Sequence, residues 1–172
     1  MYDLLIKNAM IVDGNNEVPY SADIAVEGDT IVKIGQIEEE ARCRIDAKGR
    51  LVTPGFIDIH CHSDAVIFQP GKNEKRLLQG FTTEVIGNCG ISVAPISETY
   101  KESWDTYSKP LLSNMEVPYN WNSYEEYLQV VEMEGLCLNL AGLVGHGAVR
   151  AAVVGFADRK LEEEELDTAK KL

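Results

Sequence analysis

Two histidines two positions apart, His60 and His62, are the residues whose types and spacing most directly suggest chemistry. They end the stretch PGFIDIHCH, in which a short apolar run precedes both imidazoles. Side chains two apart on a β-strand point the same way, so both rings can converge on one ion. Neutral imidazole is a good ligand for zinc and similar divalent cations. The pair therefore predicts a metal site; the alternatives are a chance H-x-H pair and hydrogen-bonded core histidines.

The strand that carries this pair is expected to have two unlike faces. Alternation assigns its residues to a mainly polar face and to an apolar or thiol face, namely Phe56, Asp58, His60 and His62 against Ile57, Ile59 and Cys61. We expect the apolar face to pack against helices and the polar face to line the inside of a barrel. The histidines would then lie at the C-terminal end of a barrel strand, where barrel active sites are built. Cys61, pointing away from the metal, is interpreted as a packing residue.

Two further residues lie at the ends of later strand candidates. Cys89 occurs in VIGNCGIS, and a cysteine thiolate is a strong zinc ligand. The alternative is a buried structural cysteine, because free cysteine behaves as a small hydrophobe. His146 occurs in GLVGHGAVR between two glycines, which let a backbone or a ligand approach closely. His146 is interpreted as a substrate contact, with a histidine bonded to backbone as the alternative.

The elements that must position these residues change in pattern at Pro54. Residues 1–52 carry short alternating runs separated by turn pairs, which predicts a small β-sheet or sandwich. The turns are expected at Asp13-Gly14, Glu27-Gly28-Asp29 and Lys48-Gly49. After Pro54, strand candidates alternate with helix candidates, which predicts parallel βα units in a second domain at residues 53–172.

Three strands and three helices are expected in this second domain. The strand candidates are residues 55–62, 81–90 and 136–147, and the helix candidates are 73–80, 121–135 and 161–172. Ser123 is the expected N-cap of the second helix and Gly135 its stop, and residues 95–120 are interpreted as a long βα loop. A closed (β/α)8 barrel needs eight such units. We therefore expect an N-terminal portion of a longer protein, whose remainder, or a complementary subunit, closes the barrel and covers the strand edges.

The composition excludes several classes of partner. The chain carries 28 acidic and 16 basic residues among 172, a net charge of −12, which repels nucleic acid and anionic membrane surfaces. No apolar run approaches the roughly 18 residues of a membrane span, and MYDLLIKNAM lacks the features of a signal peptide. The four cysteines are widely spaced, which favours thiols in a reducing cytoplasm over a disulfide framework. A cytoplasmic protein with a small-molecule substrate is expected.

With these segments in place, the sequence resembles the amidohydrolase superfamily and, within it, the N-acyl-D-amino-acid deacylase (D-aminoacylase) family. The likeness rests on YDLLIKNAMIVDGNN, GRLVTPGFIDIHCHSD, GFTTEVIGNCGIS and GLVGHGAVR. The H-x-H motif after PGFID is specific to the superfamily, and GNCGIS is more specific to the deacylases, which use a cysteine as a metal ligand. The resemblance implies an α/β fold: part of a small β-sandwich, then the start of a metal-dependent TIM-like (β/α)8 barrel that is incomplete in this chain.

The resemblance also implies an activity and a cofactor. One or two zinc ions would be bound, His60 and His62 holding the weaker metal position and Cys89 helping to hold the tight one. Family members hydrolyse an N-acyl-D-amino acid to a carboxylate and a D-amino acid. Metal-bound water would have a pKa of about 7, and a carboxylate would carry its proton to the leaving amine. That carboxylate comes from a later strand, so neither Asp58 nor Asp64 is assigned as the base, and the chain alone is expected to be inactive.

Two alternatives remain open. A cyclic-amide hydrolase of the dihydroorotase or hydantoinase type shares the H-x-H motif but usually bridges its metals with a carboxylated lysine, and GNCGIS argues against it. A non-catalytic fragment that only binds metal or a complementary subunit belongs to a different class of function.

Overall fold

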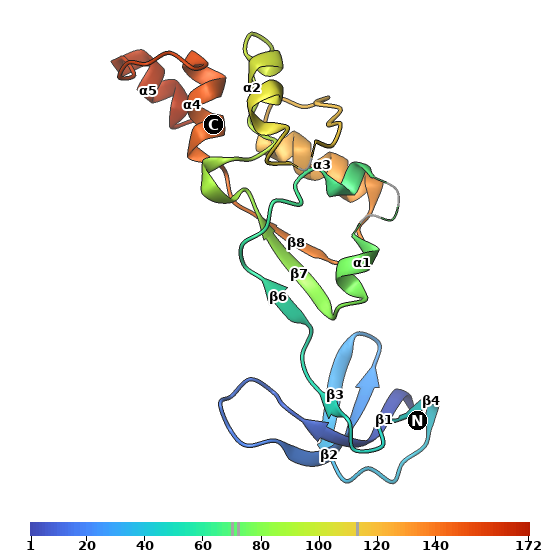
Figure 1. Ribbon diagram of the computed structural model, residues 1–172. Helices are drawn as coiled ribbons and strands as arrows, with labels where there is room; N and C mark the ends of the chain where they lie inside the picture. Colours follow the sequence, from blue (N-terminus) through green and yellow to red (C-terminus); the bar gives the residue numbers. More distant parts are fainter. Residues whose placement is uncertain (70, 72, 113) are drawn as a thin grey trace. The chain divides into compact units, whose positions relative to one another are not determined.

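The structure, a computed structural model, describes residues 1–69, 71, 73–112 and 114–172. The chain divides into two compact units, Met1–Pro54 and Gly55–Leu172, and each is described by itself (Figure 1). No helix in the described ranges is long and apolar enough to cross a membrane.

The Met1–Pro54 unit is one five-stranded mixed sheet. Its strands are β1 (Tyr2–Ile11), β2 (Tyr20–Glu27), β3 (Thr30–Gly35), β4 (Ala41–Asp46) and β5 (Leu51–Val52). The order is β3-β2-β1-β4, and β5 also pairs with β1. β1 runs antiparallel to β2 and parallel to β4 and β5. The hairpin predicted around Glu27-Gly28-Asp29 forms between β2 and β3, with Glu27 as the last residue of β2. Gly28 has φ +59, a conformation that glycine adopts at no steric cost.

A partly buried ion pair connects β1 and β2 of this sheet. Lys7 Nζ donates to Asp23 Oδ2 at 2.6 Å and to the carbonyl oxygen of Ile37 at 2.7 Å. Asp23 also accepts the backbone N–H groups of Asn8 and Ile37, at 2.9 and 3.1 Å. Burial raises the pKa of Asp23, but the hydrogen bonds from Lys7 and the two amides outweigh it and hold the pKa below its usual value.

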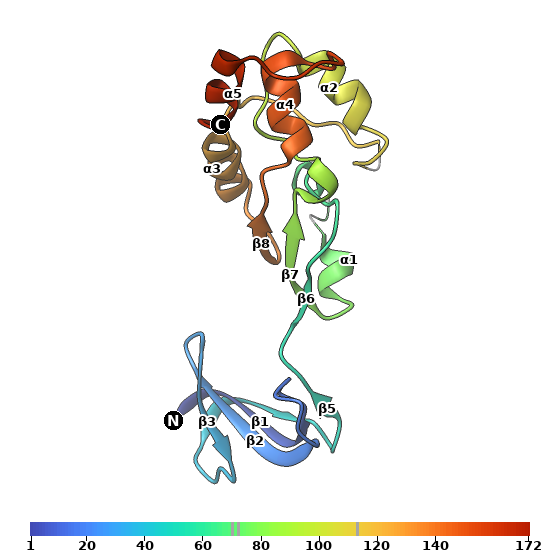
Figure 2. The same cartoon turned by 90° about the vertical axis from the view of Figure 1, so that its left-hand side faces the viewer.

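The Gly55–Leu172 unit is built on a parallel three-stranded sheet in the order β6-β7-β8 (Figure 2). The strands are β6 (Phe56–Asp58), β7 (Phe81–Ile86) and β8 (Asn139–Gly142). The α-helices are α1 (Glu74–Leu77), α2 (Lys101–Ser108), α3 (Tyr124–Glu134), α4 (His146–Val154) and α5 (Glu163–Ala169). Two 3-10 turns, η1 (Val66–Phe68) and η2 (Asn88–Gly90), complete the unit. Both strand pairs are parallel, which confirms the predicted βα units.

α3 begins and ends where its sequence predicts. The Ser123 side chain accepts the backbone N–H of Glu126 at 3.1 Å, and the Glu126 side chain accepts the backbone N–H of Ser123 at 3.0 Å. This capping box satisfies donors that the first helical turn leaves free. Gly135 is the C-cap at φ +70.

Two helices were not expected. α2 lies inside the interval interpreted as a loop; it buries Trp104 and Ser108, which are four residues apart and share one helical face. α4 replaces the end of the third predicted strand, because β8 stops at Gly142 and the chain turns helical at His146. α4 buries Ala148, Ala151 and Val154, a spacing of three that fits a helix and not a strand.

The core of this unit is rich in aromatic rings. Tyr127, Trp121 and Trp104 are all nearly inaccessible to solvent. Phe68 stacks on Trp121 at 5.3 Å, and Tyr127 packs against Trp121 at 5.2 Å between ring centroids. Aromatic pairs at such distances stabilise a core beyond the area that they bury. This core fixes α3, η1 and the loop after β7 around the ends of the strands.

Candidate metal centre

The histidine pair follows a strand instead of lying on it. β6 ends at Asp58, so the prediction that the strand continues through His62 is wrong. Cys89 likewise lies beyond its strand, in η2, three residues after the end of β7. Because β6 and β7 are adjacent and parallel, their C-terminal ends meet at one edge of the sheet. The chain beyond these two ends brings the three side chains together.

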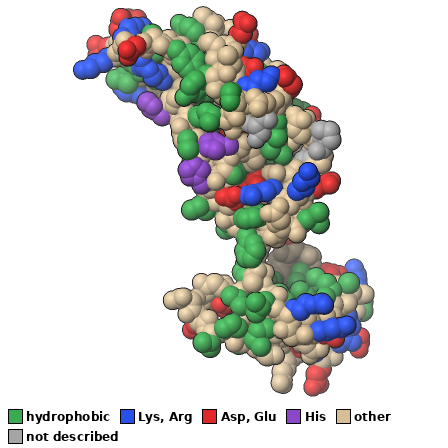
Figure 3. Space-filling model, viewed as in Figure 1, with side chains coloured by type: hydrophobic (Ala, Val, Ile, Leu, Met, Phe, Trp, Pro, Cys, Tyr) green, Lys and Arg blue, Asp and Glu red, His purple; other side chains and the backbone are tan. Residues whose placement is uncertain are grey.

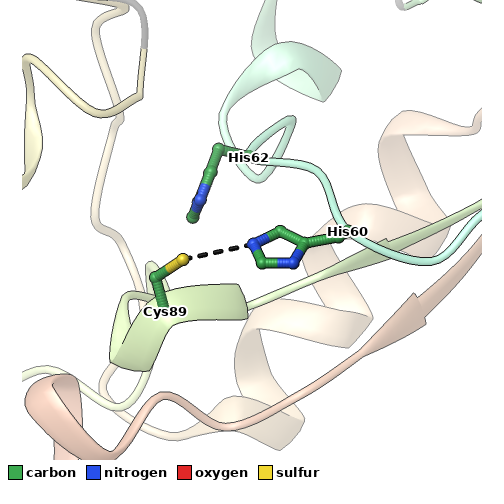
Figure 4. A group of neighbouring side chains, drawn as sticks. All are labelled: His60, His62 and Cys89. Carbon is green, nitrogen blue, oxygen red and sulfur yellow. Dashed lines mark hydrogen bonds between the residues drawn. The ribbon is translucent and has the colours of Figure 1, made fainter.

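His60, His62 and Cys89 point toward one another (Figure 4). Their candidate ligand atoms all lie within 4.8 Å of one another. His60 Nε2 and Cys89 Sγ form a hydrogen bond of 3.2 Å, and the two imidazole centroids are 5.8 Å apart with the rings at 70°. His60 and Cys89 are exposed, and histidine side chains reach the surface of this unit (Figure 3).

This donor set fits a divalent cation of the zinc type. Zinc prefers imidazole nitrogen and thiolate sulfur at about 2.0–2.3 Å, which puts tetrahedral ligand atoms roughly 3.5 Å apart. The 3.2 Å between His60 Nε2 and Cys89 Sγ is close to that value, and the remaining separations do not exceed 4.8 Å. His62 Nδ1 is buried and has no hydrogen-bond partner among the described residues. A buried polar atom without a partner is unusual, and a nitrogen available for metal binding explains it.

The turn that carries Cys89 is held in an unusual backbone conformation. Cys89 itself has φ +56, and Gly87, which introduces the turn, has φ +76. A Cβ atom at Gly87 would lie 1.9 Å from the carbonyl oxygen of Leu143, so only glycine fits there. A left-handed conformation costs a non-glycine residue of order 1–3 kcal/mol and concentrates at functional sites. The surrounding contacts therefore force Cys89 into its position beside the histidines.

Asp64 connects the histidine segment to the cysteine turn. Its side chain is almost inaccessible, and Oδ1 accepts the backbone N–H of Gly87 at 3.1 Å. The carbonyl oxygen of Asp64 accepts the hydroxyl of Tyr127 at 3.1 Å, while Oδ2 has no partner in the described part of the chain. Burial raises the pKa of Asp64 to about 7.

Asp58 contacts α1 through Arg76, against the prediction that its side chain lines the inside of a barrel. Asp58 pairs in register with Glu84 of β7, and Arg76 of α1 forms ion pairs with both carboxylates. Ile57 and Ile59, expected against helices, are instead 60% and 74% exposed. Pattern reasoning assigned the polar face to the inside of a barrel. This assignment failed for Asp58 because α1 carries Arg76, which attracts the carboxylate to the face that the helix covers.

Asp58 and Glu84 form a second acidic cluster with Cys61, their ligand atoms also lying within 4.8 Å of one another. Arg76 forms ion pairs with both carboxylates, so we interpret this cluster as an ion-pair network. Cys61 Sγ donates to the carbonyl oxygen of Val85 at 3.3 Å and packs against the core, which confirms its interpretation as a packing residue. Burial raises the pKa of the Cys61 thiol.

His146 is the first residue of α4 and is exposed, and it is not a member of the His60–Cys89 group. The glycines on either side of His146 let another backbone segment approach closely, as expected for glycine. A Cβ atom at Gly145 would lie 2.6 Å from both C and O of Gly90, and one at Gly147 would lie 2.7 Å from that oxygen. The start of α4 therefore packs directly on the turn that carries Cys89. The role of His146 as a substrate contact stays a prediction.

Sequence reasoning missed Arg76 and Glu84. Glu84 was the detectable signal, because it is one charged residue inside the otherwise uncharged run FTTEVI of a buried strand. Such a residue is rarely buried without a partner of opposite charge. The sequence does not indicate which basic residue forms the ion pair with Glu84.

The comparisons with known proteins agree with the geometry. The model of the amidohydrolase family matches residues 44–161. D-aminoacylase of Alcaligenes xylosoxydans xylosoxydans is 35% identical over 167 residues, 96% of this chain and 33% of that protein. The zinc- and phosphonate-bound N-acyl-D-glutamate deacylase of Bordetella bronchiseptica superposes with a TM-score of 0.85 at 28% identity, over 99% of this chain and 35% of that one. A D-aminoacylase crystal structure gives 0.84 at 31% identity, over 98% of this chain and 35% of that one.

The chain thus spans about a third of the length of these relatives. The family match covers well over half of its own residues and includes both histidines and Cys89. The chain belongs to the amidohydrolase family.

Proposed function

We propose that the protein is a metal-dependent hydrolase of linear amides, which converts an N-acyl-D-amino acid to a carboxylate and a D-amino acid. The observation that carries the proposal is the convergence of His60, His62 and Cys89, with His60 Nε2 3.2 Å from Cys89 Sγ. Two imidazoles and a thiol at this spacing suit zinc. The similar N-acyl-D-glutamate deacylase was crystallised with zinc and with a phosphonate that mimics the tetrahedral intermediate of its reaction.

Each residue of the site has a proposed task. A bound zinc ion supplies a Lewis acid and lowers the pKa of coordinated water. One or two ions would be held, with His60 and His62 at the weaker position and Cys89 at the tight one. Asp64 fixes the backbone of Gly87 ahead of the cysteine. His146, at the start of α4, is proposed to contact the substrate. The group that moves the proton is not assigned to any residue of this chain.

The two units would form parts of larger domains. We assign residues 1–52 to a β-sandwich and residues 53–172 to the first βα units of a barrel. The relatives are about three times longer, and the exposed side chains of Ile57 and Ile59 offer an apolar surface that further strands can cover. The remainder of the chain or a complementary subunit would close the barrel, and the isolated chain would then be inactive. The cytoplasm is the proposed compartment.

Metal analysis of the purified protein tests the ligand set. We expect bound zinc in the wild type and its loss in the His60→Ala/His62→Ala and Cys89→Ala variants, since each removes donors from the cluster. Cys43→Ala is the matched control, because Cys43 is an exposed cysteine of β4 in the other unit. Wild-type zinc content in either site variant contradicts the assignment.

Activity distinguishes the substrate classes. The protein, completed by the remainder of its chain, is assayed on N-acetyl-D-amino acids and, side by side, on dihydroorotate and hydantoin. Turnover of the linear substrates is expected. Turnover of the cyclic amides alone favours the cyclic-amide hydrolase, and zinc binding without turnover of any of them favours a non-catalytic metal-binding protein.

A further inference from the structure

We propose that Arg76 is a positioning residue for the metal centre: through Asp58 and Glu84 it fixes both ends of the segment that carries His60 and His62. The inference rests on the proposed function, because it concerns the ligands of that same site. The inference goes beyond the proposed function because it assigns a task to an arginine on α1. That arginine belongs to neither the metal ligands nor the substrate contacts.

The first attachment is at the N-terminal end of the segment. Asp58 Oδ1 accepts the backbone N–H of His60 at 3.1 Å. Asp58 Oδ2 accepts a hydrogen bond from a terminal nitrogen of Arg76. One carboxylate therefore connects the guanidinium to the backbone of the first histidine.

The second attachment is at the other end. Ser63 directly follows His62, and its hydroxyl donates to Glu84 Oε2 at 2.5 Å. Asn73 donates its side-chain amide to that same oxygen, and Arg76 Nε donates to Glu84 Oε1 at 2.8 Å. Glu84 is 1% exposed, so these are the contacts of a carboxylate that water does not reach. The segment 60–63 is thus attached to two carboxylates, and Arg76 joins them.

The geometry requires an arginine. A planar guanidinium donates in several fixed directions at once, whereas a lysine ammonium acts as a single point charge. Arg76 uses Nε for one carboxylate and a terminal nitrogen for the other. Its central carbon lies 4.2 Å from the centroid of the Phe81 ring, which holds the guanidinium in place.

The expected effect is on metal affinity. Groups that orient metal ligands through hydrogen bonds typically change metal affinity by about 10- to 100-fold when they are removed. Removing Arg76 alone would leave Glu84 buried and unpaired, which is strongly destabilising. The Arg76→Met/Glu84→Met double variant avoids this problem, because replacing both partners of a buried ion pair with apolar residues is often tolerated.

The experiment measures the zinc dissociation constant by competition with a chromophoric chelator, together with the thiolate-to-cobalt absorption of the cobalt form and the thermal melting curve. The double variant should melt close to the wild type, bind zinc about 10- to 100-fold more weakly and show an altered cobalt spectrum. Arg76→Lys should bind zinc more tightly than the double variant and more weakly than the wild type. Arg159→Met is the matched control, because Arg159 also makes a two-point ion pair, with Glu165, outside the site; it should leave zinc binding unchanged.

Two results overturn the proposal. The first is a folded double variant with wild-type zinc affinity. The second is independent of metal: in the metal-free protein the His60 amide should be protected from hydrogen exchange and should lose protection in Asp58→Ala, which leaves Glu84 paired with Arg76. Unchanged exchange in that variant refutes the attachment, and this measurement decides the matter if the double variant does not fold. A wild-type protein that binds no zinc refutes the metal centre itself, whatever the exchange data show.

Discussion

The contact between α4 and the cysteine turn makes a sharp prediction for Gly145→Ala. Gly145 has φ −69 and ψ 123, a conformation that alanine adopts without strain. The substitution therefore tests close packing and nothing about backbone freedom. Its Cβ atom would lie 2.6 Å from C and O of Gly90 and 2.8 Å from the nitrogen of Ile91. All three are backbone atoms and cannot rotate away.

The size of the effect follows from these distances. A Cβ atom needs roughly 3.4 Å, so the start of α4 and the turn at Gly90 must separate by about 0.8 Å. Overpacking of this kind costs typically ~1–3 kcal/mol in the free energy of unfolding. Cys89 precedes Gly90 and moves with it, whereas zinc bonds tolerate about ±0.2 Å. We expect zinc affinity to fall on the order of tenfold or more.

Urea denaturation of the metal-free protein and zinc competition together provide the assay. Gly135→Ala is the control: Gly135 has φ +70 at the end of α3, and nothing lies within 4 Å of its added Cβ. The control should lose roughly 1–3 kcal/mol of stability through backbone strain and keep its zinc affinity. If Gly145→Ala retains both wild-type stability and wild-type affinity, the packing argument for the position of Cys89 is refuted.

Three further substitutions test the fold. Asp23→Asn should lower the free energy of unfolding by ~1–3 kcal/mol at pH 7, since it weakens the charged hydrogen bond from Lys7. The pKa of Asp23 is lowered in the folded state, so its stabilisation is present above the ordinary value of 3.8 and disappears as the pH falls below it. Urea denaturation at several pH values should show the difference in unfolding free energy between variant and wild type closing there. A difference independent of pH contradicts this. Ser123→Ala removes a capping box and should cost about 1 kcal/mol by thermal unfolding, with a shift at the start of α3 in amide exchange. Tyr127→Phe removes a buried hydrogen bond to the carbonyl of Asp64 and should also cost ~1 kcal/mol, without changing the helical circular dichroism.

Local signals account for the elements that were predicted from sequence. The hairpin at Gly28-Asp29 and the helix between Ser123 and Gly135 are specified by turn and cap residues within them, so no distant contact is needed to identify them. α2 and α4 differ, because their helical state depends on what they bury. The side chain of Trp104 donates to the carbonyl of Ser92, twelve positions earlier, a contact that no window of sequence displays.

The candidate site likewise has one part that local sequence signals predict and one part that depends on distant contacts. The meeting of His60 with Cys89 follows from placing two adjacent parallel strands with chemistry at their ends, and the sequence indicates both. The side on which Asp58 lies could not be predicted, because it depends on Arg76, eighteen positions away on a four-residue helix. A polar face is therefore a weak guide to the inside of a barrel wherever a helix supplies a charge of opposite sign.

The strands of the parallel sheet lie side by side in the order in which they occur along the chain, and His60 and Cys89 are only 29 positions apart. The three donors follow two strands, β6 and β7, that are neighbours both in the sheet and along the chain. Contacts of short sequence separation form quickly, and metal binding contributes directly to folding free energy. An ion bound by these donors would therefore join the C-terminal ends of β6 and β7 and stabilise the pairing of the two strands.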